Sequence, residues 1–465
     1  MNSAAARAPA RTPLEVQQRL RERCQAAVAA ALGAGADEAE AYASQRDSRE
    51  VALEKGDIQL ARTQASAGLG LRVLVGGRLG FASTNQLESG SFGALARDAV
   101  ALARQGPQDP HNRLPAGAQL APRDALVDGQ LWDLPIERCV ELARTLLARA
   151  RAIDARLSID SGAVEASSHS VAVASSAGTL ASESDSGLSA SVFGMAVDGS
   201  DVGGFDHRGD WSRLAEGFEA QLERAVDLFG RTALGNLGAR PARSYRGPVL
   251  LRPEALLSML LGPLLGGLSA LAVQRGRSPL AGKLGQAVAG PNVTLHDDPS
   301  DRELAGAGAF DREGVATARR TLVSAGRLET FLYNGYAAAV EGRRSTGHAS
   351  GGTRSVPDIG LHALVMEPGE GGDEAELLGR LGQGLLVGRF SGTVDPASGD
   401  FSGVAKSARW VSGGRIQHAS GETLLQGNAF EALRSILCLS SHSERLSGSL
   451  RLPWALVDGI SVTAG

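Results

Sequence analysis

The segment from Ala255 to Val273 is the feature that most constrains the fold, because its nineteen residues carry no charged side chain. A run of this length reaches the span of a membrane helix. Three glycines and Pro263 interrupt it, however, and no second segment of comparable length accompanies it. A helix that is apolar on all sides normally lies inside a protein. We therefore expect a buried pair of core helices here and no membrane span.

The composition bounds the fold class. A chain of 465 residues is long enough for two or three domains, and its 60 glycines indicate many tight turns. Helical spacing of apolar residues is interspersed with alternating strand patterns in the first half, whereas short strands with glycine turns dominate the second. The pattern predicts an α+β protein: an N-terminal α/β region with antiparallel strands and flanking helices, then a C-terminal β-rich domain with the buried apolar helix.

The domain boundaries follow from changes of pattern along the chain. Residues 1–13 lack the apolar core of a secretory signal and are predicted to form a disordered tail. Residues 231–246 hold four arginines without clear periodicity, so the main boundary is placed there. The prediction is an N-terminal α+β region over 14–240, with a possible sub-boundary near 107–130, and a C-terminal β-rich domain over 241–465.

Charge and cysteine content exclude several classes of function. The net charge of -4 and the pI near 6.1 provide no basic surface of the kind that nucleic-acid-binding proteins carry. Cys24, Cys139 and Cys438 are far apart and odd in number, so they form no disulfide framework. Free thiols are expected in a reducing compartment, and the predicted location is cytoplasmic, with neither nucleic acid nor membrane as a partner.

Several distinctive sequence blocks follow one another along the chain. The most informative block begins with Phe-Asp-Arg-Glu-Gly and ends with Ser-Thr-Gly-His-Ala. A glycine-rich block, Phe390–Trp410, includes Gly392, Asp395, Pro396, Gly399, Asp400, Phe401 and Ser402. Together the blocks span most of the chain: Gly68–Asn85, Phe310–Ala349, Phe390–Trp410, Gly427–Asn428 and Leu456–Val462. In this order they resemble the TldD/PmbA family, also called modulators of DNA gyrase.

The resemblance implies a family that pairs zinc peptidases with metal-free sister subunits. The catalytic subunits carry His-Glu-x-x-x-His on the helix after the domain boundary, and a later cysteine completes the zinc site. In this chain Pro253 and Ser258 occupy the two histidine positions, on either side of Glu254. Neither side chain supplies the imidazole nitrogen that such a site needs. The resemblance therefore implies no catalytic residue and no metal at these positions.

Other catalytic centres find little support in the sequence. The eight histidines include no pair at helical spacing, and the chain has no Gly-x-Ser-x-Gly elbow and no phosphate-binding loop. A zinc site assembled from distant loops stays open as an alternative, with His296, His348 and His362 as ligands beside Asp297 or Asp298.

The acidic residues of the block Phe310–Ala349 have two interpretations. Asp311 and Glu313 could bind the amine of a peptide or an arginine of a partner. Alternatively, they belong to a solvated turn whose backbone is set by Gly314. The sequence does not separate these alternatives.

The end of the same block offers a second candidate binding segment. Ser345, Thr346 and Gly347 could hydrogen-bond an extended peptide, or they could form a plain turn. His348 could act as a hydrogen-bonding side chain or titrate near neutral pH.

The resemblance implies a non-catalytic PmbA/TldE-like subunit of a zinc metallopeptidase complex that acts on unfolded or precursor peptides. Its expected partner is a TldD-type catalytic subunit, which would hold the zinc, while this chain needs no cofactor. Strand edges in the C-terminal half could bind the peptide by β-augmentation. Two alternatives stay open: a homodimeric peptide-binding module without a proteolytic role, and an autonomous hydrolase with an unrecognised metal site.

Overall fold

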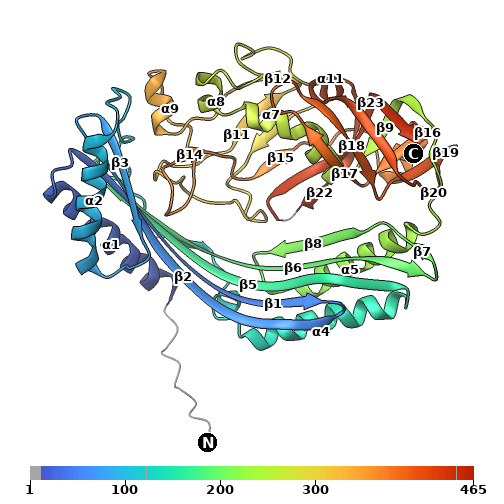
Figure 1. The fold of residues 1–465 in the computed structure, drawn as a ribbon, viewed down its shortest axis with the longest axis horizontal. Coiled ribbons are helices and arrows are strands. Elements are labelled where there is room, and N and C mark those ends of the chain that lie inside the picture. Colours follow the sequence, from blue (N-terminus) through green and yellow to red (C-terminus); the bar gives the residue numbers. More distant parts are fainter. Residues whose placement is uncertain (1–11, 122, 447, 465) are drawn as a thin grey trace, which may run out of the picture.

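The structure is a computed structural model that describes residues 12–121, 123–446 and 448–464. Most of the predicted tail, residues 1–11, lies outside the described residues. Two β-sheets organise the chain, one in each half, and Figure 1 shows the C-terminal half lying over one face of the long N-terminal sheet. The α+β fold class predicted from the sequence is confirmed.

The N-terminal sheet is built from long antiparallel strands. Its main path runs β3-β2-β1-β5-β6-β4, and β7 and β8 also pair with β6. The strands are β1 (Glu38–Glu54), β2 (Asp57–Val75), β3 (Arg78–Thr84), β4 (Arg123–Leu126), β5 (Leu157–Ser175), β6 (Leu180–Asp198), β7 (Asp201–Val202) and β8 (Asp206–Ser212).

Helices cover one face of this sheet. They are α1 (Pro13–Gly33), η1 (Ser89–Ser91), α2 (Phe92–Gln105), α3 (Gly129–Trp132), α4 (Ile136–Ile153) and α5 (Phe218–Gly235). Alternate residues of a strand point to opposite faces. Ala41 and Val51 of β1 are thus both buried on the helix face, the first in the core with α1 and α2 and the second in the core with α4 and α5. Residues of the other parity, such as Glu40, face the C-terminal half.

The C-terminal half contains a larger mixed sheet with the main path β12-β11-β10-β15-β23-β9-β16-β19-β20. Its strands are β9 (Tyr245–Leu251), β10 (Leu295–Asp297), β11 (Arg320–Ser324), β12 (Arg327–Leu328), β15 (Leu364–Met366), β16 (Gln383–Val387), β17 (Arg389–Val394), β18 (Asp400–Lys406), β19 (Arg409–Ser412), β20 (Arg415–Ala419), β21 (Thr423–Asn428), β22 (Ile436–Leu446) and β23 (Leu450–Ala464). A separate small pair consists of β13 (Ala349–Ser350) and β14 (Asp358–Ile359).

The uncharged segment forms the helical core of this half, as predicted. It folds as α6 (Pro253–Leu256), the π-helical turn η2 (Leu257–Leu261), α7 (Gly262–Gly267) and α8 (Ala270–Gln274). Met259, Leu260 and Leu264 are fully buried. One stripe stays exposed, where Ser258 is followed at helical spacing by two glycines. Among the described residues, no helix is both long and apolar enough to cross a membrane.

Three further helices complete the C-terminal half: α9 (Gly335–Val340), α10 (Glu374–Leu381) and α11 (Ala429–Arg434). The apolar patterns of the sequence predict helices near 374–386 and 428–439, but α10 and α11 end earlier because strands β16 and β22 begin directly after them. At the end of α10, Gly382 has a positive φ of 62°, a conformation that glycine adopts without steric cost.

Candidate functional site

The positions equivalent to the zinc-binding motif lie at the start of the buried helices. Pro253 is the first residue of α6, where its missing N–H costs no hydrogen bond. The Ser258 hydroxyl donates to the Glu254 carbonyl at 2.7 Å. The Glu254 carboxylate accepts from Arg208 of β8 at 2.8 Å, which ties the two halves together.

These residues do not fit a zinc ion. Pro253 offers no side-chain donor, and the Ser258 hydroxyl is engaged with the backbone of its own helix. Glu254 is a single carboxylate that is paired with a guanidinium. A zinc site needs at least three nitrogen, sulfur or oxygen ligands converging on one point, so no chemistry at this position can be assigned to a metal.

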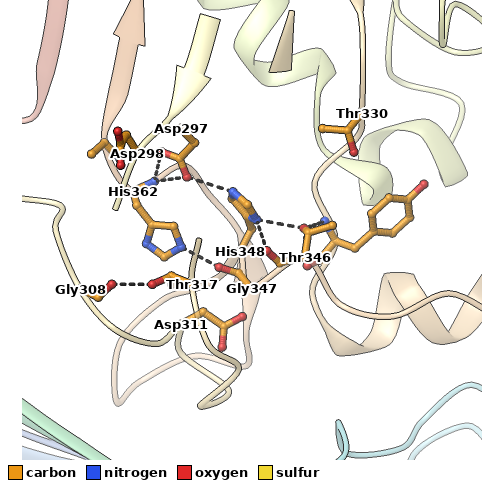
Figure 2. Close-up of polar contacts among 12 residues, drawn as sticks. Asp297, Asp298, Gly308, Asp311, Thr317, Thr330, Thr346, Gly347, His348 and His362 are labelled. Carbon is orange, nitrogen blue, oxygen red and sulfur yellow. Dashed lines mark hydrogen bonds and ion pairs between the residues drawn. The ribbon is translucent and has the colours of Figure 1, made fainter. Parts of the chain in front are cut away.

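A different cluster gathers Asp297, His348 and His362 in the C-terminal half (Figure 2). One ligand atom from each residue lies within 4.8 Å of the other two. Nε2 of His348 lies 2.9 Å from Oδ2 of Asp297, and both side chains are almost completely buried. Nε2 of His362 lies 2.7 Å from the Gly347 carbonyl. The cluster joins Asp297, at the end of β10, to His348 and His362, which lie 51 and 65 residues further along the chain on either side of the β13–β14 pair.

Hydrogen bonds already engage most donor atoms of this cluster. Because a carbonyl only accepts, Nδ1 of His348 donates to the Thr346 carbonyl at 2.9 Å, and Nε2 of His362 donates to that of Gly347. Oδ1 of Asp297 accepts the backbone N–H groups of His362 and Ala363. The cluster is therefore a hydrogen-bonded junction in which a metal would have to compete with formed bonds.

The charge state of the cluster follows from opposing effects. Burial disfavours the Asp297 carboxylate, but its bond to His348 and the neighbouring His362 outweigh burial and lower the pKa of Asp297. Burial lowers the pKa of His362. Nε2 of His348 lies against the Asp297 carboxylate at 2.9 Å, while its Nδ1 donates to the Thr346 carbonyl.

The predicted distant-loop zinc set is only partly assembled. His296 lies outside the cluster, with Nδ1 at 3.1 Å from the Thr321 hydroxyl and Nε2 at 2.7 Å from Glu367. Asp298 accepts from Ser300 and lies 3.5 Å from Arg319. Successive residues of β10 point to opposite faces, so Asp297 and His296 could not both face one metal. The inclusion of His296 was wrong.

The acidic turn around Asp311 is buried, so the alternative of a solvated turn is wrong. Oδ1 of Asp311 accepts the backbone N–H groups of Glu313 and Val315 at 2.9 Å, and Oδ2 accepts that of Ala349 at 2.9 Å. Burial raises the pKa of Asp311 to about 7, and the charge of Glu313 adds to the rise. Gly314 has a positive φ of 77°, as the prediction of a turn requires.

Glu313 and Arg312 form a buried ion network with the N-terminal sheet. Arg72 of β2 lies 2.9 Å from Glu313 and 2.6 Å from Glu40 of β1. Arg312 lies 2.9 Å from Glu40 and stacks over the ring of Tyr42 at 4.1 Å. Glu313 also accepts the backbone N–H of Gly335. Binding of a peptide or partner by Asp311 or Glu313 stays a prediction that would require these bonds to be displaced.

The second candidate segment forms hydrogen bonds within the chain. The Ser345 hydroxyl donates to the Tyr333 carbonyl at 3.0 Å, and the Thr346 hydroxyl accepts the Tyr333 N–H at 2.8 Å. Gly347 has a positive φ of 74°, and a Cβ at this position would meet the Ala316 carbonyl at 2.7 Å. These contacts favour the plain turn over a peptide-binding segment.

Sequence reasoning missed the charged cavity between the two halves. It is open to solvent and has a volume of about 340 Å³, and its lining includes Arg208 and Arg224 from the N-terminal half and Glu254, Arg389 and Arg445 from the C-terminal half. Arginines spread over some 240 residues give no local pattern, so only the folded chain brings them together.

Comparisons with known proteins cover most of the chain. Family models described as PmbA/TldA metallopeptidase domain 1, central domain and C-terminal domain match residues 39–103, 129–237 and 244–464. Metalloprotease PmbA of Escherichia coli O157:H7 is 26% identical over 96% of this chain and 98% of that protein. The Metalloprotease PmbA homolog of Haemophilus influenzae is 28% identical over 95% of this chain and 97% of that protein.

A solved structure shares the fold. The crystal structure of TldE from Thermococcus kodakarensis superposes with a TM-score of 0.88 at 22% identity, covering 95% of this chain and 100% of that chain.

Proposed function

The chain belongs to the PmbA/TldD metallopeptidase family, and from this premise we propose that it is the non-catalytic, PmbA/TldE-like subunit of a cytoplasmic zinc metallopeptidase complex. The complex acts on unfolded or precursor peptides. A TldD-type partner carries the zinc and cleaves the peptide, while this chain contributes part of the chamber wall and holds the substrate.

One observation carries the proposal. Pro253 and Ser258 occupy the positions where the family's catalytic subunits have histidines, and Glu254 between them is paired with Arg208. The framework of the fold persists while the ligands do not. That combination is expected when a partner subunit supplies the catalysis.

The C-terminal sheet supports a role in peptide binding. Among the described strands, β17 pairs only with β18, so one of its edges is free. A free edge presents unpaired N–H and carbonyl groups that can bind an extended peptide regardless of its sequence. Arg389, the first residue of β17, lines the cavity between the halves, so a peptide on this edge would lie beside that cavity.

Reconstitution with a TldD-type subunit tests the proposal. An unstructured peptide with a fluorophore and a quencher at its ends should be cleaved faster by the pair than by either chain alone. A folded protein of the same composition serves as the control and should remain intact. Equal cleavage by the TldD-type subunit alone would contradict the proposal.

A second candidate function, an autonomous hydrolase, is favoured by the cluster of Asp297, His348 and His362. In that case the isolated chain cleaves peptides, and replacing His348 by alanine abolishes the activity. The subunit proposal expects no activity of the isolated chain in either form.

A further inference from the structure

The cavity between the two halves is the strongest unassigned site on the molecule. Strand β8 and helix α5 line it from the N-terminal half, and α6, β17 and β22 line it from the C-terminal half. In Figure 1, β8 lies directly below β22 and β17, where the two halves face each other. A volume of about 340 Å³ is sufficient for one or two amino-acid residues of a peptide.

Two of the four arginines that line the cavity are neutralised by carboxylates. Arg208 lies 2.9 Å from Asp206 and 2.8 Å from Glu254, and Arg445 lies 2.8 Å from Asp210. These pairs hold the walls in place and leave those two guanidinium groups little capacity for another anion.

The other two arginines are paired less closely with carboxylates. Arg224 of α5 has no ion pair with any residue that the structure describes, and its side chain lines the cavity. Arg389 donates from Nη2 to the Phe205 carbonyl at 2.5 Å, but its Nε is buried without a hydrogen-bond partner. An oxygen of Asp206 lies 3.9 Å from this Nε, which is too long for a hydrogen bond. Among the described residues, Arg224 therefore lacks an ion-pair partner, and Arg389 has only a distant one.

Two other features define the ligand more closely. Oε2 of Glu254 is buried without a hydrogen-bond partner, so it can accept an N–H group. Leu228, Leu257 and Leu446 line the same cavity and offer apolar contacts. The acidic side chains of the lining repel a doubly charged phosphate more than a singly charged carboxylate. Carboxylate, N–H and aliphatic side chain together are the groups of a peptide's C-terminal residue.

We propose that this cavity binds the carboxylate of an extended peptide, with Arg224 and Arg389 as its cationic partners and the leucines around an aliphatic C-terminal side chain. Guanidinium groups match carboxylates in shape and charge, which makes these hydrogen bonds strong. The inference rests on the proposed function, because it takes for granted that the chain binds peptides. An internal aspartate or glutamate side chain is the other source of the same chemistry.

Fluorescence anisotropy with the full chain tests the inference. The probe is an unstructured, uncharged, N-terminally labelled peptide that ends in leucine, prepared with a free C-terminal carboxylate and with a C-terminal amide. We expect the amide form to bind about tenfold more weakly. Arg224→Gln and Arg389→Gln should each weaken binding of the acid form by a similar factor and leave binding of the amide form unchanged. Arg415→Gln, on an exposed residue of β20, is the matched control and should change neither.

The outcomes separate the inference from the proposed function. Equal affinity for both peptide forms would overturn the inference and leave peptide binding in place, whereas no binding of any peptide would contradict both. If both arginine variants still prefer the acid form, the carboxylate binds elsewhere on the chain and the proposed site is wrong. If an amidated peptide with one internal aspartate binds as tightly as the acid form and depends on the same arginines, carboxylate binding is supported and the side chain is its source. Arg224 is exposed, so its variant remains informative even if Arg389→Gln disturbs folding.

Discussion

Arg72 of β2 and Glu313 of the C-terminal half form an ion pair of 2.9 Å that is removed from solvent. Glu40 lies on the other side of the same guanidinium, and Arg312 pairs with Glu40 in turn. The positive charges of two arginines and the negative charges of two glutamates thus balance between the halves. Burial disfavours the Arg72 cation, but the two glutamates outweigh burial and raise the pKa of Arg72.

Replacing Glu313 by glutamine should destabilise the protein by about 3 kcal/mol, because it removes one charge from a buried, balanced network. This loss of stability lies at the lower end of the range for broken buried ion pairs, because Arg72 keeps Glu40 as a partner. Urea denaturation followed by circular dichroism measures the change. Glu219→Gln breaks an exposed ion pair with Arg138 and should cost less than about 1 kcal/mol. Equal losses in the two variants would show that the buried network does not stabilise the fold.

Asp311 should make the protein less stable as pH rises from about 4 to 7. Its pKa in the folded chain is raised to about 7, first by burial and then by Glu313. An aspartate in an unfolded chain titrates near pH 3.9, so across this window the folded state holds a proton that the unfolded state has lost. Stability attributable to this proton therefore decreases with rising pH, by at most about 1.4 kcal/mol per pH unit.

The Asp311→Asn variant isolates this contribution, because asparagine does not titrate. The difference in unfolding free energy, parent minus variant, should fall steadily between pH 4.5 and pH 7 when both are measured by urea denaturation. The test is the pH dependence of this difference, because a constant cost of the altered hydrogen bonds shifts the difference equally at every pH. A difference that is independent of pH would show that Asp311 is ionised throughout the window.

The buried helices could be predicted because their signal is local. An uncharged run with interior glycines permits few placements, and the folded chain buries Met259 and Leu264 as expected. The π-helical turn at Leu257–Leu261 carried no recognisable sequence signal. The ends of α10 and α11 were predicted too late, because the apolar residues of the following strands continue the helical pattern by coincidence.

The candidate site could be predicted only in part, because its residues are distant in the sequence and meet only in the folded chain. Sequence reasoning selected His348 and His362 as possible neighbours, but it could not exclude His296, because the orientation of β10 is set by its pairing with β11 and β15. Arg72 and Glu40 were missed altogether. They lie more than 230 residues from Glu313, and only the docking of the halves makes their charges relevant.

Leu260→Ala should cost about 2–5 kcal/mol, because Leu260 is fully buried in the C-terminal core and alanine would leave a cavity. Leu437→Ala is the matched control: Leu437 is 56% exposed, so its replacement should change stability by less than about 0.5 kcal/mol. Thermal and urea unfolding of both variants check the placement of the helix. A Leu260→Ala protein as stable as the parent would contradict its burial.

The chain purified alone, without an affinity tag, should retain far less than one zinc per molecule after dialysis against trace zinc, as measured by elemental mass spectrometry. Pro253 and Ser258 offer no imidazole, and both ring nitrogens of His348 and Nε2 of His362 are engaged by carbonyls or by Asp297. Near-stoichiometric zinc would contradict the metal-free proposal. If that zinc were lost in His348→Ala but kept in His296→Ala, it would belong to the buried cluster, because His296 bonds Thr321 and Glu367 instead. Loss in neither variant would place the metal elsewhere on the chain.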